Sequence, residues 1–188
     1  MNNATNEIAK RSTYLQPMKK LLLPFLFVGT MVMIYVMGKT SATLKTTATP
    51  CGILNLEFAY NTTKTAGVIN AWEPNNNITV AKNNTYYDFI FLAFYATFLF
   101  FTCKKIAEIK NSNTGLLIAN GAIAAGILDI AENAGMLFTL SGNVSGTVGF
   151  ITTVCSLIKW VLVITAVAYC LAGIVYIILH KKFNMLFT

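Results

Sequence analysis

Four long apolar stretches run along the chain, and polar segments separate them. The stretches cover residues 21–38, 88–103, 115–138 and about 149–179. A helix needs about 20 apolar residues to cross the hydrocarbon core of a bilayer, and each stretch comes close to that length or exceeds it. The pattern therefore predicts an all-α integral membrane protein in which four transmembrane helices form a bundle.

The segment 39–87, between the first two stretches, is more polar and predicts an ordered outer loop. Apolar residues recur within it at helical spacing, and Pro74 follows them as a stop signal. This spacing predicts a short amphipathic helix near residues 63–72, with Trp72 at the membrane interface as part of a cap. The Asn-rich residues after Pro74 predict a polar loop. With this outer loop included, residues 21–180 are expected to form a single transmembrane domain.

Basic residues lie mainly at one end of the predicted helices. The nine at this end are Lys10, Arg11, Lys19, Lys20, Lys104, Lys105, Lys110, Lys181 and Lys182. Cytoplasmic loops of membrane proteins carry an excess of Lys and Arg, so both termini, with the segments 1–20 and 181–188, are predicted to be cytoplasmic. The net charge of +7 then reflects topology and contact with anionic lipid, and no nucleic-acid partner is expected. The first apolar run is longer than that of a signal peptide, which favours an uncleaved helix.

The third and fourth stretches each carry a stripe of small and polar residues at alternating steps of three and four. The stripes consist of Gly115, Ala119, Ala122, Gly126, Asp129 and Asn133, and of Thr152, Ser156, Lys159, Val163, Ala166, Cys170 and Gly173. Such steps place residues on one face of a helix, and small residues let a neighbouring backbone approach closely. Both faces are therefore expected to pack, with their polar ends toward the outside.

Ionisable residues inside the predicted helices form a candidate site in the outer leaflet. At a rise of about 1.5 Å per residue, they fall at similar depths. The candidate residues are Asp88, Asp129, Glu132, Asn133 and Lys159, with Tyr95 two turns below Asp88. A charge at the bilayer centre costs about 2.5–3.5 kcal/mol on insertion scales, so we expect Lys159 to pair with a carboxylate. Because carboxylates outnumber lysine, at least one is expected to be protonated, solvated or bound to a cation.

Three interpretations of this polar layer stay open. In the first, a binding or transport protein holds a proton, a cation or the amine of a lipid-like ligand, and Asp129 is the deepest candidate. In the second, a structural or accessory subunit of a larger membrane complex uses the layer to fasten helices, while Glu132 faces solvent and Lys159 snorkels to the interface. A membrane enzyme acting on a lipid headgroup is the third. The expected partners are the lipid bilayer and either a second copy of the chain or a larger complex.

The residues present argue against several chemistries. A single histidine is too few for paired-histidine haem ligation, and the chain has no P-loop, G-x-G-x-x-G or G-x-S-x-G motif. We expect no cofactor and no metal. The cysteines contain no C-x-x-C pair, and Cys103 and Cys170 are expected to be packing residues. Cys51 and Cys155 both fall near the oxidising outer face, where a disulfide between them is an alternative to two free thiols.

The order of short motifs resembles an uncharacterised group of small bacterial four-helix membrane proteins. The motifs are LEFAY, INAW, YYDFIFLAFYATFLFFTC, LDIAEN and KW, which extend from about Leu56 to Trp160. The resemblance implies a four-helix protein of the bacterial inner membrane, includes Trp160 among the positions to watch and adds Glu57 to the candidate positions, but it implies no activity. Glu57 either folds over the polar layer as part of the cap or is a solvated loop charge, and its residue type favours the second.

Overall fold

The computed structural model describes the backbone of residues 2–180 and the side chains of residues 21–180. This part of the chain consists of helices and their connections. They are α1 (Asn2–Thr43), α2 (Leu54–Glu57), α3 (Thr62–Trp72), the 3-10 helix η1 (Glu73–Asn75), α4 (Asn77–Lys110), α5 (Asn113–Leu140) and α6 (Gly146–Leu179). The predicted cytoplasmic tail, 181–188, lies outside the described residues, as do the side chains of the segment 1–20.

Four helices are long and apolar enough to cross a membrane. They are the Leu21–Thr43 part of α1 and the whole of α4, α5 and α6. Large apolar side chains are exposed on the surfaces of the long helices, for example Phe25 on α1 and Val161 on α6. Apolar surface of this extent is typical of contact with membrane or protein partners. The predicted all-α chain with four candidate transmembrane helices is therefore confirmed.

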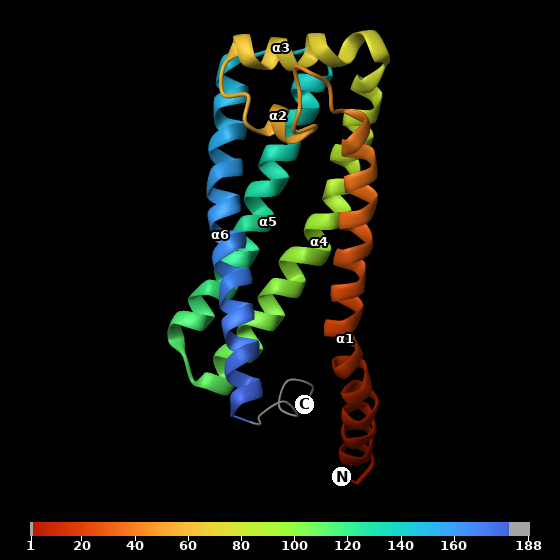
Figure 1. Ribbon diagram of the computed structural model, residues 1–188. Helices are drawn as coiled ribbons and strands as arrows, with labels where there is room; N and C mark the ends of the chain where they lie inside the picture. The colour runs from red at the N-terminus through yellow and green to blue at the C-terminus, as the bar shows by residue number, and fades with distance from the viewer. Residues whose placement is uncertain (1, 181–188) are drawn as a thin grey trace.

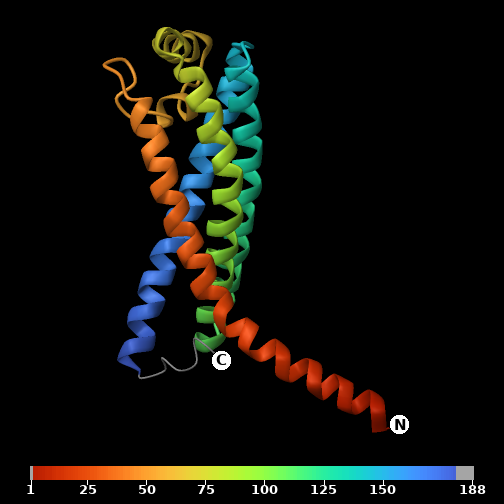
Figure 2. The same cartoon turned by 90° about the vertical axis from the view of Figure 1, so that its right-hand side faces the viewer.

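The long helices lie side by side, and α4 contacts the other three. Helix α4 packs against α1, α5 and α6, and α5 also packs against α6. Figure 1 shows α3 lying across one end of the long helices with α2 beneath it, while the α4–α5 turn and the end of α6 lie at the opposite end. The turned view in Figure 2 shows α1 beside α4 and the same short helices at the upper end. We call residues 44–76 the cap.

The second long helix begins at Asn77 and not at residue 88 as predicted. The predicted bounds of the outer loop, 39–87, are therefore wrong, and the Asn-rich segment after Pro74 is helical and not a loop. Hydrogen bonds to the end of α1 explain the difference. The Nδ2 atom of Asn84 donates to the Met37 carbonyl at 3.1 Å, and that of Asn77 donates to the Thr43 carbonyl at 3.2 Å. An apolar pattern does not detect a helix whose buried face is polar.

The short helix predicted near residues 63–72 is confirmed as α3. The side chain of Asn61 caps it by accepting a hydrogen bond from the Lys64 backbone N–H at 2.9 Å. At its other end Trp72 is fully buried, and its Nε1 donates to the Leu44 carbonyl at 2.9 Å and to Thr49 Oγ1 at 3.1 Å. Trp72 thus lies inside the cap and not against lipid, because the connection that follows α1 supplies the partners that a buried indole N–H needs.

The two predicted packing stripes are buried along α5 and α6. Every member is buried except Val163, which is half-buried. Small residues bring the helices close together, since a Cβ added at Gly126 of α5 would lie 3.0 Å from the Cβ of Ala96 on α4. This close packing fixes the positions of the polar residues at the cap end of both helices.

Candidate functional site

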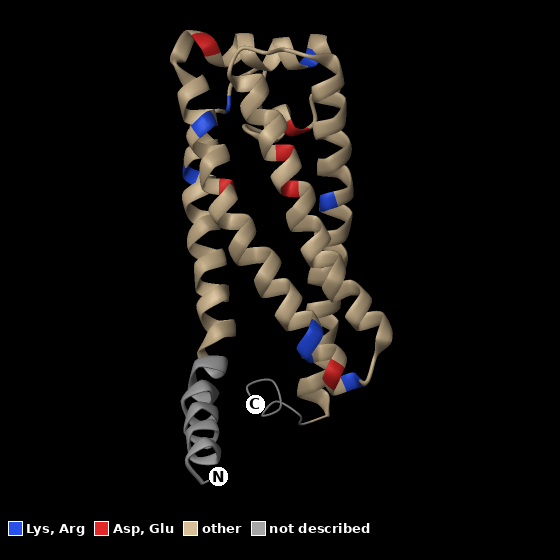
Figure 3. Ribbon diagram, turned by 180° about the vertical axis from the view of Figure 1, so that it is seen from behind, with Lys and Arg blue, Asp and Glu red and all other residues tan. Residues whose placement is uncertain are grey.

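A buried ionic cluster lies where α2, α5 and α6 meet, in the part of the molecule nearer the cap. We define it as Glu57, Asp129, Glu132 and Lys159; Figure 3 shows acidic residues gathered there. The Lys159 Nζ atom lies 2.7 Å from Glu132 Oε2, 3.0 Å from Asp129 Oδ1 and 3.9 Å from Glu57 Oε2. None of the four side chains is more than 9% exposed. Lys159 is therefore the shared partner of three carboxylates.

Helix spacing places the α5 carboxylates next to each other. Asp129 and Glu132 are three residues apart, so they lie on neighbouring positions of one helix surface. Asp129 faces the ammonium group as expected. The interpretation in which Glu132 faces solvent is wrong, since its side chain is 0% exposed. The reason is that α5 packs against both α4 and α6, which buries a face wider than the predicted stripe.

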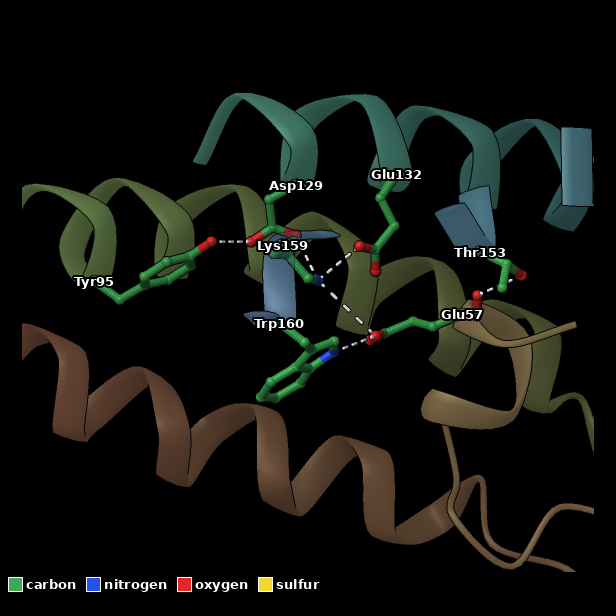
Figure 4. A network of polar contacts seen from close by, with 7 residues as sticks. All are labelled: Glu57, Tyr95, Asp129, Glu132, Thr153, Lys159 and Trp160. Carbon is green, nitrogen blue, oxygen red and sulfur yellow. Dashed lines mark hydrogen bonds and ion pairs between the residues drawn. The ribbon is translucent and has the colours of Figure 1, made fainter. Parts of the chain in front are cut away.

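The cap supplies the third carboxylate of the ionic cluster. Helix α2 docks on α6 because Thr153 Oγ1 donates to the Glu57 backbone carbonyl at 3.0 Å. The Glu57 side chain then reaches Lys159, and its Oε2 accepts a hydrogen bond from Trp160 Nε1 at 3.3 Å (Figure 4). The interpretation of Glu57 as a solvated loop charge is therefore wrong. Hydrophobic periodicity did not predict the contact between Glu57 and Lys159, and only the order of the short motifs pointed to Glu57.

Helix α4 adds a tyrosine and a fourth carboxylate. The Tyr95 hydroxyl donates to Asp129 Oδ2 at 2.7 Å, so both oxygens of Asp129 have partners. Asp88 is 8% exposed and lies in the electrostatic neighbourhood of Asp129, Lys159 and Asn133. The polar layer predicted from helix depth is thus brought together from three long helices.

Several buried polar atoms beside the ionic cluster have no hydrogen-bond partner among the described residues. They are both side-chain amide atoms of Asn133, the hydroxyl of Ser156 and Oε1 of Glu132. Asn133 and Ser156 are both 0% exposed. Leaving a buried polar atom unpaired costs about 1–3 kcal/mol, so such atoms point to a further polar or ionic contact. Sequence analysis placed Ser156 on a packing stripe but missed it as a site residue.

The surroundings of the ionic cluster differ on its two sides. Toward the α4–α5 turn, Tyr95 borders an apolar core that includes Leu99, Cys103 and Ile106. Toward the cap, a small hollow is lined by Leu56, Thr65, Met136, Thr139, Gly149 and Thr152. Between the carboxylates themselves, the central position is occupied by the Lys159 ammonium group.

The remaining candidate residues are two tryptophans and two cysteines. Trp72 belongs to the cap interior, whereas Trp160 covers Glu57 from the outside and is 39% exposed. Cys51 is exposed and Cys155 is half-buried, and both are free cysteines. The disulfide between them stays a prediction.

Replacing Tyr95 with phenylalanine is expected to lower the free energy of unfolding by about 1.5–3 kcal/mol, the usual contribution of a hydrogen bond to a charged group. The substitution removes the donor to Asp129 and keeps the ring. Thermal unfolding in detergent micelles measures the effect. Tyr86→Phe is the matched control because Tyr86 lies on the same helix and is 56% exposed. Equal melting temperatures for the two variants would contradict a stabilising Tyr95–Asp129 bond.

No family model matches the chain, and neither a curated protein nor a solved structure matches it. The function is therefore argued from the geometry of the ionic cluster.

Proposed function

We propose that this protein is a membrane-embedded binding protein whose carboxylates hold a proton in the outer leaflet. The supporting observation is the charge imbalance of the buried site. Three carboxylates surround one ammonium group, and Asp88 adds a fourth nearby. These four are a majority of the seven acidic residues of the chain. Uncompensated charge at this depth is strongly unfavourable, and a proton bound to a carboxylate removes part of it.

The packing of the ionic cluster favours a proton over a larger cation. A metal ion or an amine bound between Glu57, Asp129 and Glu132 would need the position that the Lys159 ammonium group occupies. A proton needs no additional space. The buried amide of Asn133 lies near Asp88, and it can accept a hydrogen bond from a protonated carboxyl group or donate one to an ionised carboxylate.

The apolar core next to Tyr95 favours binding over conduction. Leu99, Cys103 and Ile106 continue the α4 face below Tyr95, and Ala166 and Cys170 face them from α6. The residues of this core include no Asp, Glu, His or Lys that could carry a proton from the ionic cluster toward the α4–α5 end of the described residues. The proposal for a single chain is therefore reversible proton binding from the cap side, and transport would require an oligomer.

The proposed orientation has the cap outside and both termini in the cytoplasm of a bacterium. Nine of the fourteen Lys and Arg residues lie near the α4–α5 turn, before the first apolar stretch or after the last. Of the other five, Lys39, Lys45, Lys64 and Lys82 lie toward the cap, and Lys159 belongs to the ionic cluster. The positive-inside rule then assigns this end to the cytoplasm. In this orientation the ionic cluster lies at the depth of the outer leaflet of the inner membrane.

A second candidate function is that of a structural or accessory subunit. It is favoured by one observation, namely that the contacts of Lys159 join α6 to α5 and to α2 of the cap. In this alternative the ionic cluster fastens the helices and binds nothing, and a larger membrane protein docks on the cap.

Asp129→Asn distinguishes the two candidates. In the first case the carboxylates are in excess and share a proton, and the isosteric amide replaces one of them. The free energy of unfolding is then expected to change by less than about 1 kcal/mol, because asparagine still accepts the Tyr95 hydrogen bond. If the ionic cluster is only a fastener with each charge required, breaking a buried ion pair lowers that energy by about 3–5 kcal/mol. Unfolding by SDS titration in mixed micelles measures the difference, with Glu108→Gln at an exposed position as the control.

A further inference from the structure

Two buried thiols outside the ionic cluster lie in contact between α4 and α6. The Sγ atom of Cys103 is 3.3 Å from that of Cys170, and both are free cysteines. Cys103 is 0% exposed and Cys170 is 6% exposed. The two residues are 67 positions apart in the sequence, so only the packing of the two helices brings them together. Sequence spacing alone predicted separate packing residues.

The helix crossing holds the two sulfur atoms in place. Helices α4 and α6 run in the same direction (Figure 1), so the pair formed by Cys103 and Cys170 is followed one turn later by the pair formed by Ile106 and Gly173. A Cβ added at Gly173 would lie 2.5 Å from Ile106 Cγ2, which shows how close the helices are. On the other side, Cys103 Sγ lies 3.6 Å from the Ala166 carbonyl oxygen. Small residues on α6 thus set the distance between the sulfurs.

We propose that Cys103 and Cys170 form a dithiol modification site, which a peroxide oxidises to a disulfide that joins α4 to α6. The sulfur atoms are 3.3 Å apart in the reduced form. A disulfide bond is about 2.05 Å long, so the sulfurs need to approach by about 1.3 Å. Side-chain rotation supplies a movement of this size while the helix backbones stay packed.

The reaction with hydrogen peroxide is balanced without any other reactant. The Cys170 sulfur, the more exposed of the two, attacks one peroxide oxygen and breaks the O–O bond. It becomes a sulfenic acid, and the other oxygen leaves as water with the thiol proton. The Cys103 sulfur then attacks the sulfenic sulfur, the S–O bond breaks, and the hydroxyl leaves as a second water with the Cys103 proton. Two thiols are oxidised by two electrons in total, and one peroxide is reduced to two water molecules.

The surroundings of the two thiols select the class of oxidant. Apolar side chains of the same core, including Leu99, Ile106 and Ala166, enclose the sulfurs. Charged or bulky disulfide reagents do not enter such a core, whereas a small uncharged peroxide passes through apolar surroundings. The bond would form below the ionic cluster, between the helix that carries Tyr95 and the helix that carries Lys159. Oxidation would therefore fix the separation of these two helices.

The experiment uses the full chain with Cys51→Ser and Cys155→Ser, which leaves only the buried pair. The protein in detergent micelles is treated with hydrogen peroxide, denatured in SDS and alkylated with N-ethylmaleimide, and its intact mass is measured. The expected product takes up no maleimide, is lighter than the reduced chain by two hydrogen atoms and yields a peptide that joins residues 103 and 170. Maleimide on both cysteines after peroxide treatment, or a disulfide only between two chains, would overturn the proposal.

A packing variant tests whether the helix crossing positions the thiols. Gly173→Ala in the same background places a methyl group against Ile106, so disulfide formation is expected to slow by about tenfold because disulfide geometry is strict. Gly67→Ala is the control, since a Cβ added there meets nothing within 4 Å. Circular dichroism confirms that both variants are helical. Equal rates of disulfide formation in the two folded variants would show that the crossing does not position the pair, against the proposal.

Discussion

Replacing Lys159 with methionine is expected to lower the free energy of unfolding by about 3–5 kcal/mol, the usual cost of removing one partner from a buried ion pair. Methionine keeps the length and apolar character of the side chain and removes only the ammonium group. Glu132 and Asp129 then lose their partner at 2.7 and 3.0 Å, and Glu57 loses the more distant contact at 3.9 Å. SDS titration in mixed micelles measures the change.

Two further variants make the Lys159 result specific. Lys39→Met removes an exposed lysine of α1 and is expected to change the unfolding energy by less than about 0.5 kcal/mol. The double variant Lys159→Met with Asp129→Asn is expected to be more stable than Lys159→Met alone, because fewer carboxylates are left without a cation. If Lys159→Met were as stable as Lys39→Met, the ionic cluster would not be held together by its charge.

Replacing Trp72 with alanine is expected to release the cap, because the substitution weakens the packing of the cap on the long helices by about 3–5 kcal/mol. Trp72 is 0% exposed, so its removal leaves a large cavity among Leu44, Leu56 and the other apolar residues of the cap. The Leu44 carbonyl also loses the indole donor at 2.9 Å. Limited proteolysis from the outside of proteoliposomes is expected to cleave residues 44–76 in the variant and not in the wild type.

The size of the Trp72 effect separates packing from hydrogen bonding. Trp72→Phe retains most of the ring and removes the N–H, so a smaller loss of about 1–3 kcal/mol is expected. Tyr60→Ala is the control for a cap residue that is 47% exposed, and it is expected to leave cleavage unchanged. Cleavage of Trp72→Ala at the wild-type rate would mean that the cap is held by other contacts. Because α2 carries Glu57, cap release also removes one carboxylate from Lys159.

The sequence predicted the helices because apolar length and helical spacing are local properties. The four long apolar helices, the helix α3 and the packing stripes of α5 and α6 follow from such patterns. The predicted start of α4 lay too far along the chain. Asn77 and Asn84 are buried and form hydrogen bonds to α1, and apolar periodicity does not detect such polar packing. Local pattern therefore predicts a helix best where its packing is apolar.

The candidate site was predicted in part, since helix depth alone grouped Asp88, Asp129 and Lys159. Depth does not fix the rotation of a helix about its axis or the fold of a loop. For this reason the sequence did not predict that Glu132 is buried or that Glu57 of the cap contacts Lys159, since both features depend on tertiary contacts. The contact between Cys103 and Cys170 likewise depends on the crossing of α4 and α6 and has no counterpart in sequence spacing.

The most direct test of proton binding is infrared spectroscopy of the purified protein at neutral pH, read at the C=O stretching band of a protonated carboxyl group. Spectra of the wild type are compared with those of Glu57→Gln, Asp88→Asn, Asp129→Asn and Glu132→Gln, with Glu73→Gln at an exposed cap position as the control. We expect the band in the wild type and in Glu73→Gln, and its loss or shift in at least one of the four site variants. A wild-type spectrum without the band would mean that all four carboxylates are ionised, which would contradict the proposal that the site holds a proton.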